Sequence, residues 1–190
     1  MRKIFHSLLI LLLLSVSPLI AANNKTPKAE DILKAAQAKS AEQNKPILLI
    51  FGASWCEGCH QLDTFLAYPE IAPIFDKYFI VARLTFGEGA AGHRDWDTPG
   101  ADLLIEKYGG VYSNGSVGLP FVAVLDAKAR LIISSNQPGK ANAPGGPGIG
   151  FPTAPDEINW FLSMLVKSAP AITPDETAKI QSALPKAAAD

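Results

Sequence analysis

The only two cysteines of the chain, Cys56 and Cys59, are separated by two residues within the pentapeptide WCEGC. A structural disulfide usually joins segments far apart in sequence, because closing a long loop removes the most entropy from the unfolded chain. A Cys-x-x-Cys pair closes a very short loop, and its thiolate is the nucleophile of thiol–disulfide exchange. The spacing therefore favours a redox-active dithiol over a static crosslink.

The elements around the pair are expected to place Cys56 at the start of a helix. Residues 46–52 (PILLIFG) form an apolar run of strand length, typical of a strand covered on both faces. The pattern over residues 59–67 is helical. At a helix N-terminus, unpaired backbone N–H groups and the helix dipole favour a thiolate. We therefore predict Cys56 as the nucleophile and Cys59 as the more covered thiol that resolves the mixed disulfide.

The remaining patterns predict an α/β chain. Thr26-Pro27 reads as a cap and first turn, and residues 173–176 (TPDE) as a capping box with proline at the first helical position. Strand–helix alternation followed by a hairpin implies a central mixed sheet with helices on both faces and an extra C-terminal helix. Helical patterns cover 26–44, 59–67, a short segment ending at 75, 101–108, and segments starting near 156 and 174; strand patterns cover 46–52, 78–86, 119–125 and 131–135.

This order and two motifs resemble the thioredoxin family, nearest to exported bacterial thioredoxin-like proteins with a Trp-Cys-x-x-Cys-His core. The motif WCEGC follows a buried strand, and Gly118-Leu119-Pro120 opens a later one. The resemblance covers about residues 27–168 and implies a thioredoxin fold. It also implies a cis peptide bond before Pro120, facing the cysteines, and a Leu119 backbone free to hydrogen-bond an extended substrate. Trp55, Leu119 and Pro120 are accordingly expected to bind the partner peptide.

One position departs from the family pattern. Thioredoxins carry a buried acid on the strand five residues before the motif tryptophan, and Ile50 occupies that position here. Glu57 and His60 are the candidate replacements as a base, since an imidazole can accept a proton near neutral pH. A carboxylate about 6 Å from a thiolate in a water-like dielectric would also disfavour the thiolate by about 0.7 kcal/mol. Glu57 is therefore expected to make the pair more reducing, unless it is an ordinary first-turn acid.

Three other kinds of site are considered. The sequence CEGCH also fits covalent c-type haem attachment, with Met164 or His93 as the second axial ligand. The loop 87–100 groups His93, Asp95 and Asp97 around a tryptophan, but a solvated loop with one packed tryptophan is favoured over a metal site. The glycine-rich run 145–150 lacks the strand and helix that a phosphate-binding loop requires. No metal and no cofactor is predicted.

The N-terminus predicts export. Arg2 and Lys3 precede an apolar run, residues 8–14, that is shorter than the roughly 20 residues of a membrane span, and Ala21-Ala22 offers a cleavage site. Residues 1–22 are therefore read as a signal peptide, with a retained anchor as the alternative. Removing them takes away two of 17 basic residues and none of 18 acidic ones, leaving a net charge of about −3. This balance excludes a basic face for nucleic acid.

Taken together, the patterns predict an exported, periplasmic thiol–disulfide oxidoreductase. Residues 23–168 form the thioredoxin-like domain and residues 169–190 a C-terminal helical extension. The partners are protein thiols and disulfides together with an upstream redox partner; the protein is expected to be a monomer without stable membrane insertion after cleavage. A redox-inactive module that holds extended peptides in the same groove is the alternative function.

Overall fold

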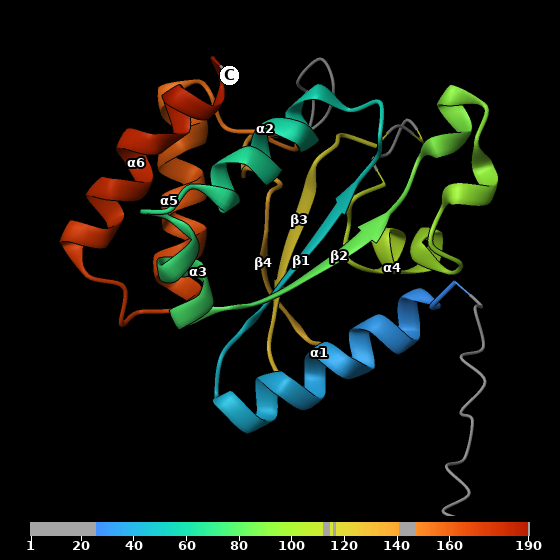
Figure 1. Cartoon of the computed structure of the whole chain (residues 1–190), viewed down its shortest axis with the longest axis horizontal. Helices are drawn as coiled ribbons and strands as arrows, with labels where there is room; N and C mark the ends of the chain where they lie inside the picture. The colour runs from blue at the N-terminus through green and yellow to red at the C-terminus, as the bar shows by residue number, and fades with distance from the viewer. Residues whose placement is uncertain (1–25, 112–114, 116, 141–146, 190) are drawn as a thin grey trace, which may run out of the picture.

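Within the part of the chain that the structure describes, four strands form one mixed sheet in the order β2-β1-β3-β4 (Figure 1). The computed structural model describes residues 26–111, 115, 117–140 and 147–189, so the predicted signal peptide lies outside it. β1 runs parallel to β2 and antiparallel to β3, and β3 and β4 form an antiparallel hairpin. The strands are β1 (Ile47–Gly52), β2 (Ile80–Thr85), β3 (Phe121–Leu125) and β4 (Leu131–Ser134). The predicted mixed sheet with a terminal hairpin is confirmed.

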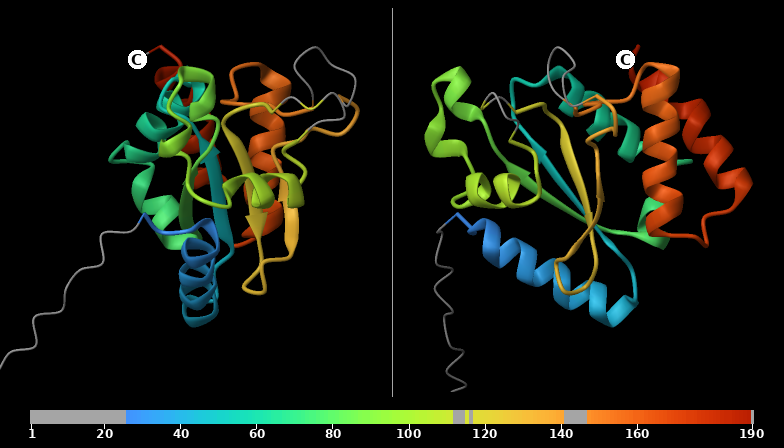
Figure 2. Two further views of the ribbon diagram at one scale, coloured as in Figure 1. Left: turned by 90° about the vertical axis from the view of Figure 1, so that its right-hand side faces the viewer. Right: turned by 180° about the vertical axis from the view of Figure 1, so that it is seen from behind.

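Helices cover both faces of this sheet (Figures 1 and 2). Alternate side chains of β1 enter two separate hydrophobic clusters. The first cluster contains Leu48 and Ile50, and the second contains Ile47, Leu49 and Phe51. This is why β1 is apolar throughout instead of alternating. The first cluster is shared with α2 (Glu57–Ala67), α3 (Ala72–Tyr78), α5 (Pro155–Ser168) and α6 (Pro174–Ala187); the second is shared with α1 (Ala29–Gln43) and α4 (Ala101–Lys107).

The start of α1 differs from the prediction. Thr26 and Pro27 precede the helix, which begins at Ala29 after Lys28, and Lys28 makes no side-chain capping bond. Instead, the backbone N–H of Ala29 donates to Pro99 O at 2.9 Å. An amide at the helix start thus finds its acceptor in the loop before α4, a long-range partner that a local capping pattern cannot reveal.

The C-terminal helix α6 starts at the predicted capping box. Thr173 Oγ1 accepts from the Glu176 amide at 3.2 Å, and Glu176 Oε2 accepts from the Thr173 amide at 2.9 Å. Tyr78 Oη lies 2.8 Å from the same carboxylate oxygen, and Lys77 Nζ lies 3.0 Å from Glu176 Oε1. The Thr173 amide, followed by the Tyr78 hydroxyl, lowers the pKa of Glu176 from its ordinary value of 4.5 to about 2.

The rest of α6 belongs to the main core. Its apolar face packs on α2 and α5, and Gln61 Nε2 of α2 donates to Ala188 O just past its end at 3.3 Å. Within the described part of the chain, no helix is both long and apolar enough to cross a membrane. The buried residues that α6 contributes are Ile180, Ala183, Leu184 and Ala187.

Candidate functional site

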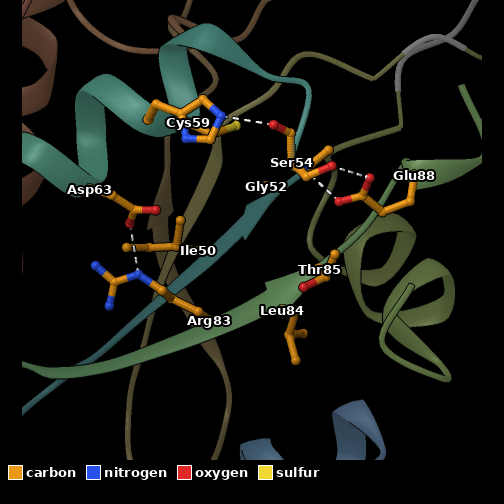
Figure 3. A pocket seen from close by; sticks show the side chains of 11 residues that line it. Ile50, Gly52, Ser54, Cys59, Asp63, Arg83, Leu84, Thr85 and Glu88 are labelled. Carbon is orange, nitrogen blue, oxygen red and sulfur yellow. Dashed lines mark hydrogen bonds and ion pairs between the residues drawn. The ribbon is translucent and has the colours of Figure 1, made fainter. Parts of the chain in front are cut away.

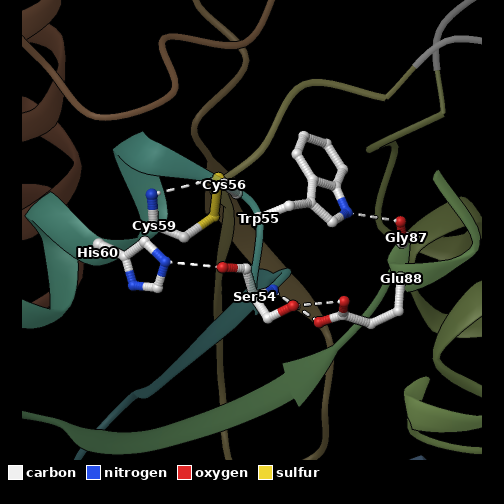
Figure 4. The surroundings of a disulfide bond; sticks show 7 residues. All are labelled: Ser54, Trp55, Cys56, Cys59, His60, Gly87 and Glu88. Atoms are coloured by element: carbon white, nitrogen blue, oxygen red, sulfur yellow. Dashed lines mark hydrogen bonds between the residues drawn. A yellow bond between two sulfur atoms is a disulfide. The ribbon is translucent and has the colours of Figure 1, made fainter. Parts of the chain in front are cut away.

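Cys56 and Cys59 form a disulfide at the junction of β1 and α2, with their Cα atoms 5.2 Å apart (Figure 4). Cys56 is the N-cap residue of α2, and its Sγ accepts a hydrogen bond from the backbone N–H of Cys59 at 3.2 Å. An amide donor and the positive end of the helix dipole both stabilise negative charge at this position. The structure thus places the Cys56 sulfur where the sequence predicted a favoured thiolate.

Burial does not separate the two cysteines. The exposed fraction is 5% for Cys56 and 8% for Cys59, so the expectation that Cys59 is the more covered residue is wrong for this oxidised form. Both sulfurs pack in a small cluster with Ala53 and Leu119, which shields Cys56 as well. The distinction between them therefore rests on position at the helix N-terminus.

Two glycines allow close packing around the Cys-x-x-Cys turn. A Cβ on Gly52 would lie 3.2 Å from Cys59 Sγ, a tight contact that the sulfur could relieve only by shifting a few tenths of an ångström. A Cβ on Gly58 would lie 3.2 Å from Pro120 Cδ and 3.4 Å from Phe151 Cβ. The Leu119–Pro120 peptide bond is cis, as the family resemblance implies. Pro120 thus packs against the Cys-x-x-Cys turn. Phe151 also packs against Gly58, although it lies in a Gly- and Pro-rich stretch for which the sequence pattern predicted no regular structure.

The structure also brings Trp55 and Leu119 together. Trp55 is 50% exposed, and its indole Nε1 donates to Gly87 O at 2.9 Å. Gly87 has φ +93°, and a Cβ there would lie 3.4 Å from Leu119 Cδ1 and 3.7 Å from Trp55 Cζ2. The loop after β2 therefore holds the indole beside the residue that precedes Pro120. Leu119 packs on the cluster of the two cysteines, and its side chain and the Trp55 indole both lie close to Gly87.

Glu57 and His60 both lie on exposed positions of the first turn of α2. His60 Nε2 lies 2.7 Å from Ser54 O (Figure 4). Because a carbonyl only accepts hydrogen bonds, Nε2 carries the hydrogen, and only Nδ1 of the neutral ring keeps a lone pair. His60 thus fastens the turn before Cys56, and its Nε2 cannot act as the base considered from the sequence.

A pocket of about 230 Å³ lies beside Cys59, between α2, β1 and β2 (Figure 3). Glu88, which sequence reasoning missed, lines it and is only 1% exposed. Its carboxylate accepts from the Ser54 amide at 2.6 Å and from Ser54 Oγ at 2.7 Å. At another wall of the pocket, Arg83 Nε pairs with Asp63 Oδ1 at 2.9 Å. The only sequence signal for Glu88 was its place in the loop next to the end of a strand.

The loop 87–100 is more ordered than predicted. It contains two short 3-10 helices, η1 (Glu88–Ala91) and η2 (Arg94–Trp96), and Asp97 Oδ1 accepts from the Glu88 amide at 3.0 Å. Trp96 is 54% exposed and stacks on His93 with ring centres 4.1 Å apart, so the expected packed tryptophan lies instead on the surface. Among the described residues, no three His, Cys, Asp or Glu side chains converge as metal ligands.

The residues suggested for haem do not fit that group. The sulfurs that would form thioether bonds are bonded to each other in a buried cluster. Met164 is fully buried in the core between α5 and the sheet, and the other proposed axial ligand, His93, is stacked on Trp96. The arrangement fits a different chemistry, in which a disulfide next to a helix N-terminus opens and closes by thiol exchange.

A family model described as thioredoxin-like matches residues 28–127. Comparison with curated proteins gives no match. Among solved structures, a disulphide isomerase from Xylella fastidiosa Temecula1 is 25% identical, with 61% of this chain and 79% of that chain covered and a TM-score of 0.45.

Two further solved structures are similar to this chain. One is described as DsbH oxidoreductase, with 18% identity, coverage of 84% of this chain and 94% of that chain, and a TM-score of 0.43. The other is the C-terminal domain of DsbD from Neisseria meningitidis in the oxidised form, with 23% identity, coverage of 73% and 98%, and a TM-score of 0.41.

Proposed function

Because the chain belongs to the thioredoxin-like family and carries the Cys56–Cys59 pair, it is a thiol–disulfide oxidoreductase, and we propose that it is an exported reductant of protein disulfides. The observation that carries the exchange activity is the position of the Cys56 sulfur at the N-cap of α2, where this sulfur accepts a hydrogen bond from the Cys59 amide. That position stabilises the thiolate that must attack a partner.

The exchange has two steps. The Cys56 thiolate attacks one sulfur of the partner disulfide, forming a mixed disulfide and releasing the partner's other sulfur as a thiolate, which takes up a proton. Cys59 then loses its proton and attacks Cys56 Sγ, forming the Cys56–Cys59 disulfide and releasing the second partner sulfur. Two electrons and two protons pass to the partner, and an upstream redox partner restores the dithiol. The two thiols carry the electrons, so no cofactor enters these steps.

The surface beside the disulfide suits an extended peptide. Trp55 offers an exposed indole held by Gly87, and the backbone of Leu119 precedes a cis proline that packs on Gly58. We assign Trp55, Leu119 and Pro120 to partner binding. Apolar contact from the indole and main-chain hydrogen bonds from Leu119 would hold a partner with little regard to its sequence.

The reducing direction is supported by charge. Glu57 follows Cys56 directly, and neither residue between the cysteines is basic. A carboxylate near the thiolate destabilises the reduced form and so favours transfer of electrons to a partner. Export is supported by the charged and apolar pattern of residues 1–22, which predicts a mature chain starting at Asn23.

Insulin reduction with dithiothreitol as the electron source tests the activity. The mature protein should accelerate precipitation of the insulin B chain, and Cys56→Ser should abolish the acceleration. Cys59→Ser should instead accumulate mixed disulfides with partners in cells, since attack survives and resolution is lost. Undiminished activity of Cys56→Ser would overturn the assignment. Absence of both insulin reduction and trapped partners would favour the redox-inactive peptide-binding module.

Separate measurements test location and assembly. Expression of the full chain in a bacterium, followed by periplasmic extraction and N-terminal sequencing, should give a product that begins at Asn23. Retention of residues 1–22 in the membrane fraction would support the alternative of an uncleaved anchor. Sedimentation of the mature protein should give the mass of a monomer.

A further inference from the structure

Glu88 is a buried carboxylate next to the disulfide that the exchange steps above do not use. It is 1% exposed and shares the pocket beside Cys59 (Figure 3). Both of its oxygens accept from one residue, Ser54, through the backbone amide and the hydroxyl. Among the described residues, no lysine, arginine or histidine forms an ion pair with it. Burying a carboxylate costs free energy, so a buried carboxylate whose hydrogen-bond donors are neutral needs an explanation.

Ser54 links Glu88 to the redox turn. It lies two residues before Cys56, and its carbonyl receives the His60 Nε2 hydrogen bond (Figure 4). The turn between β1 and α2 is therefore held from both sides, by Glu88 of η1 and by His60 of α2. The remaining ionisable groups that line the pocket are Asp63 and Arg83, which are paired with each other. Because Arg83 is paired with Asp63, it forms no ion pair with Glu88.

We propose that Glu88 is a positioning and charge-setting residue for the dithiol. Through Ser54 it fixes the turn that carries Cys56, and its negative charge at the pocket shared with Cys59 disfavours the thiolate of the reduced protein. This inference rests on the proposed reductant function and deepens it, because a carboxylate that opposes the thiolate favours the disulfide form. Glu88 forms no covalent bond; the reaction that it biases converts protein dithiol and oxidised glutathione into protein disulfide and two glutathione thiols.

Glu88→Gln separates charge from geometry. The amide can keep both hydrogen bonds, because Oε1 accepts from the Ser54 amide and Nε2 donates to Ser54 Oγ. We expect the pH midpoint of Cys56 alkylation by iodoacetamide in the reduced protein to fall by about half to one unit, a three- to tenfold shift in the thiolate equilibrium. At pH 9, where the thiolate is populated, the equilibrium with glutathione should shift about threefold or more toward the dithiol.

Two matched variants serve as controls. Glu106→Gln makes the same chemical change at an exposed position of α4, on the other face of the sheet, and should leave the midpoint unchanged. Ser54→Ala removes one hydrogen bond to Glu88 and keeps the charge, so it should not lower the midpoint. A midpoint lowered equally by Ser54→Ala and Glu88→Gln would show that turn geometry, not charge, is responsible, and would overturn the charge assignment.

An unchanged midpoint and unchanged glutathione equilibrium in folded Glu88→Gln would overturn the proposal. If that variant does not fold, Glu88→Ser takes its place, since water from the open pocket can then replace the carboxylate oxygens at Ser54. Alkylation and glutathione equilibria need no protein partner, whereas insulin reduction does. A wild-type protein that fails with insulin but shows the Glu88 effect would refute the reductant function alone.

Discussion

Gly58 offers a direct test of how the Cys-x-x-Cys turn meets Pro120. A Cβ at Gly58 would already lie 3.2 Å from Pro120 Cδ and 3.4 Å from Phe151 Cβ, so the two γ-carbons of valine have no room on this side. Overpacking of this kind costs about 1–3 kcal/mol. Replacing glycine by valine within a helix returns at most about 0.4 kcal/mol of propensity. We therefore expect Gly58→Val to lower the free energy of unfolding of the oxidised protein by about 1–2 kcal/mol.

Urea unfolding and thermal unfolding measure this loss, which corresponds to a melting temperature about 2–8 °C lower for a domain of this size. Gly58→Ala is the matched control, because a single Cβ needs a shift of only a few tenths of an ångström and gains helix propensity; it should stay within about 0.5 kcal/mol of the wild type. Ala67→Val reports the cost of valine at an exposed position of the same helix.

Activity should follow the same order. Gly58→Val pushes Pro120 and Phe151 away from the turn, so insulin reduction should be slower than in Gly58→Ala at equal folded concentration. If the valine variant is as stable and as active as the alanine variant, Gly58 does not face Pro120, and the packing of the groove described above is refuted.

Three further outcomes are expected. Glu57→His removes a carboxylate and adds a partly positive ring beside Cys56, so it should raise the reduction potential of the pair by about 30 mV. Equilibration of the protein against glutathione, followed by thiol trapping, measures this potential; an unchanged or lower value would mean that Glu57 points away from the thiolate. Glu176 has a folded pKa of about 2 against an ordinary 4.5, so its contribution to stability is complete above about pH 4.5 and is lost as the pH falls toward 2; urea unfolding should show Glu176→Gln less stable than wild type at pH 7, with a smaller difference at pH 3, and a constant difference would contradict this. Leu184 is fully buried in the core that α6 shares with α2 and α5, so Leu184→Ala should cost about 2–5 kcal/mol in denaturant unfolding, whereas a cost below about 1 kcal/mol would mean that α6 is only loosely attached.

The sequence by itself determined the features that depend on local pattern. The apolar run before Cys56 and the helical spacing after it put the pair at a strand-to-helix junction, which the structure confirms as the β1–α2 turn. The capping box at Thr173 was equally readable, because all of its partners lie within one helical turn. The cis bond before Pro120 was implied only by family resemblance, since most bonds before proline are trans.

Tertiary structure decided what depends on contacts between distant segments. Glu88 lies in a Gly-rich stretch where a carboxylate is normally solvated, and it is buried only because η1 folds back onto Ser54 across 34 residues of chain. Phe151 reaches Gly58 from a segment without periodicity, and the Ala29 amide finds Pro99 instead of a local cap. The hydrophobic period and the capping residues of a sequence predict only the interactions of a residue with others a few positions away. The burial and charge environment of the dithiol instead come from loops whose path is fixed only when both faces of the sheet are covered.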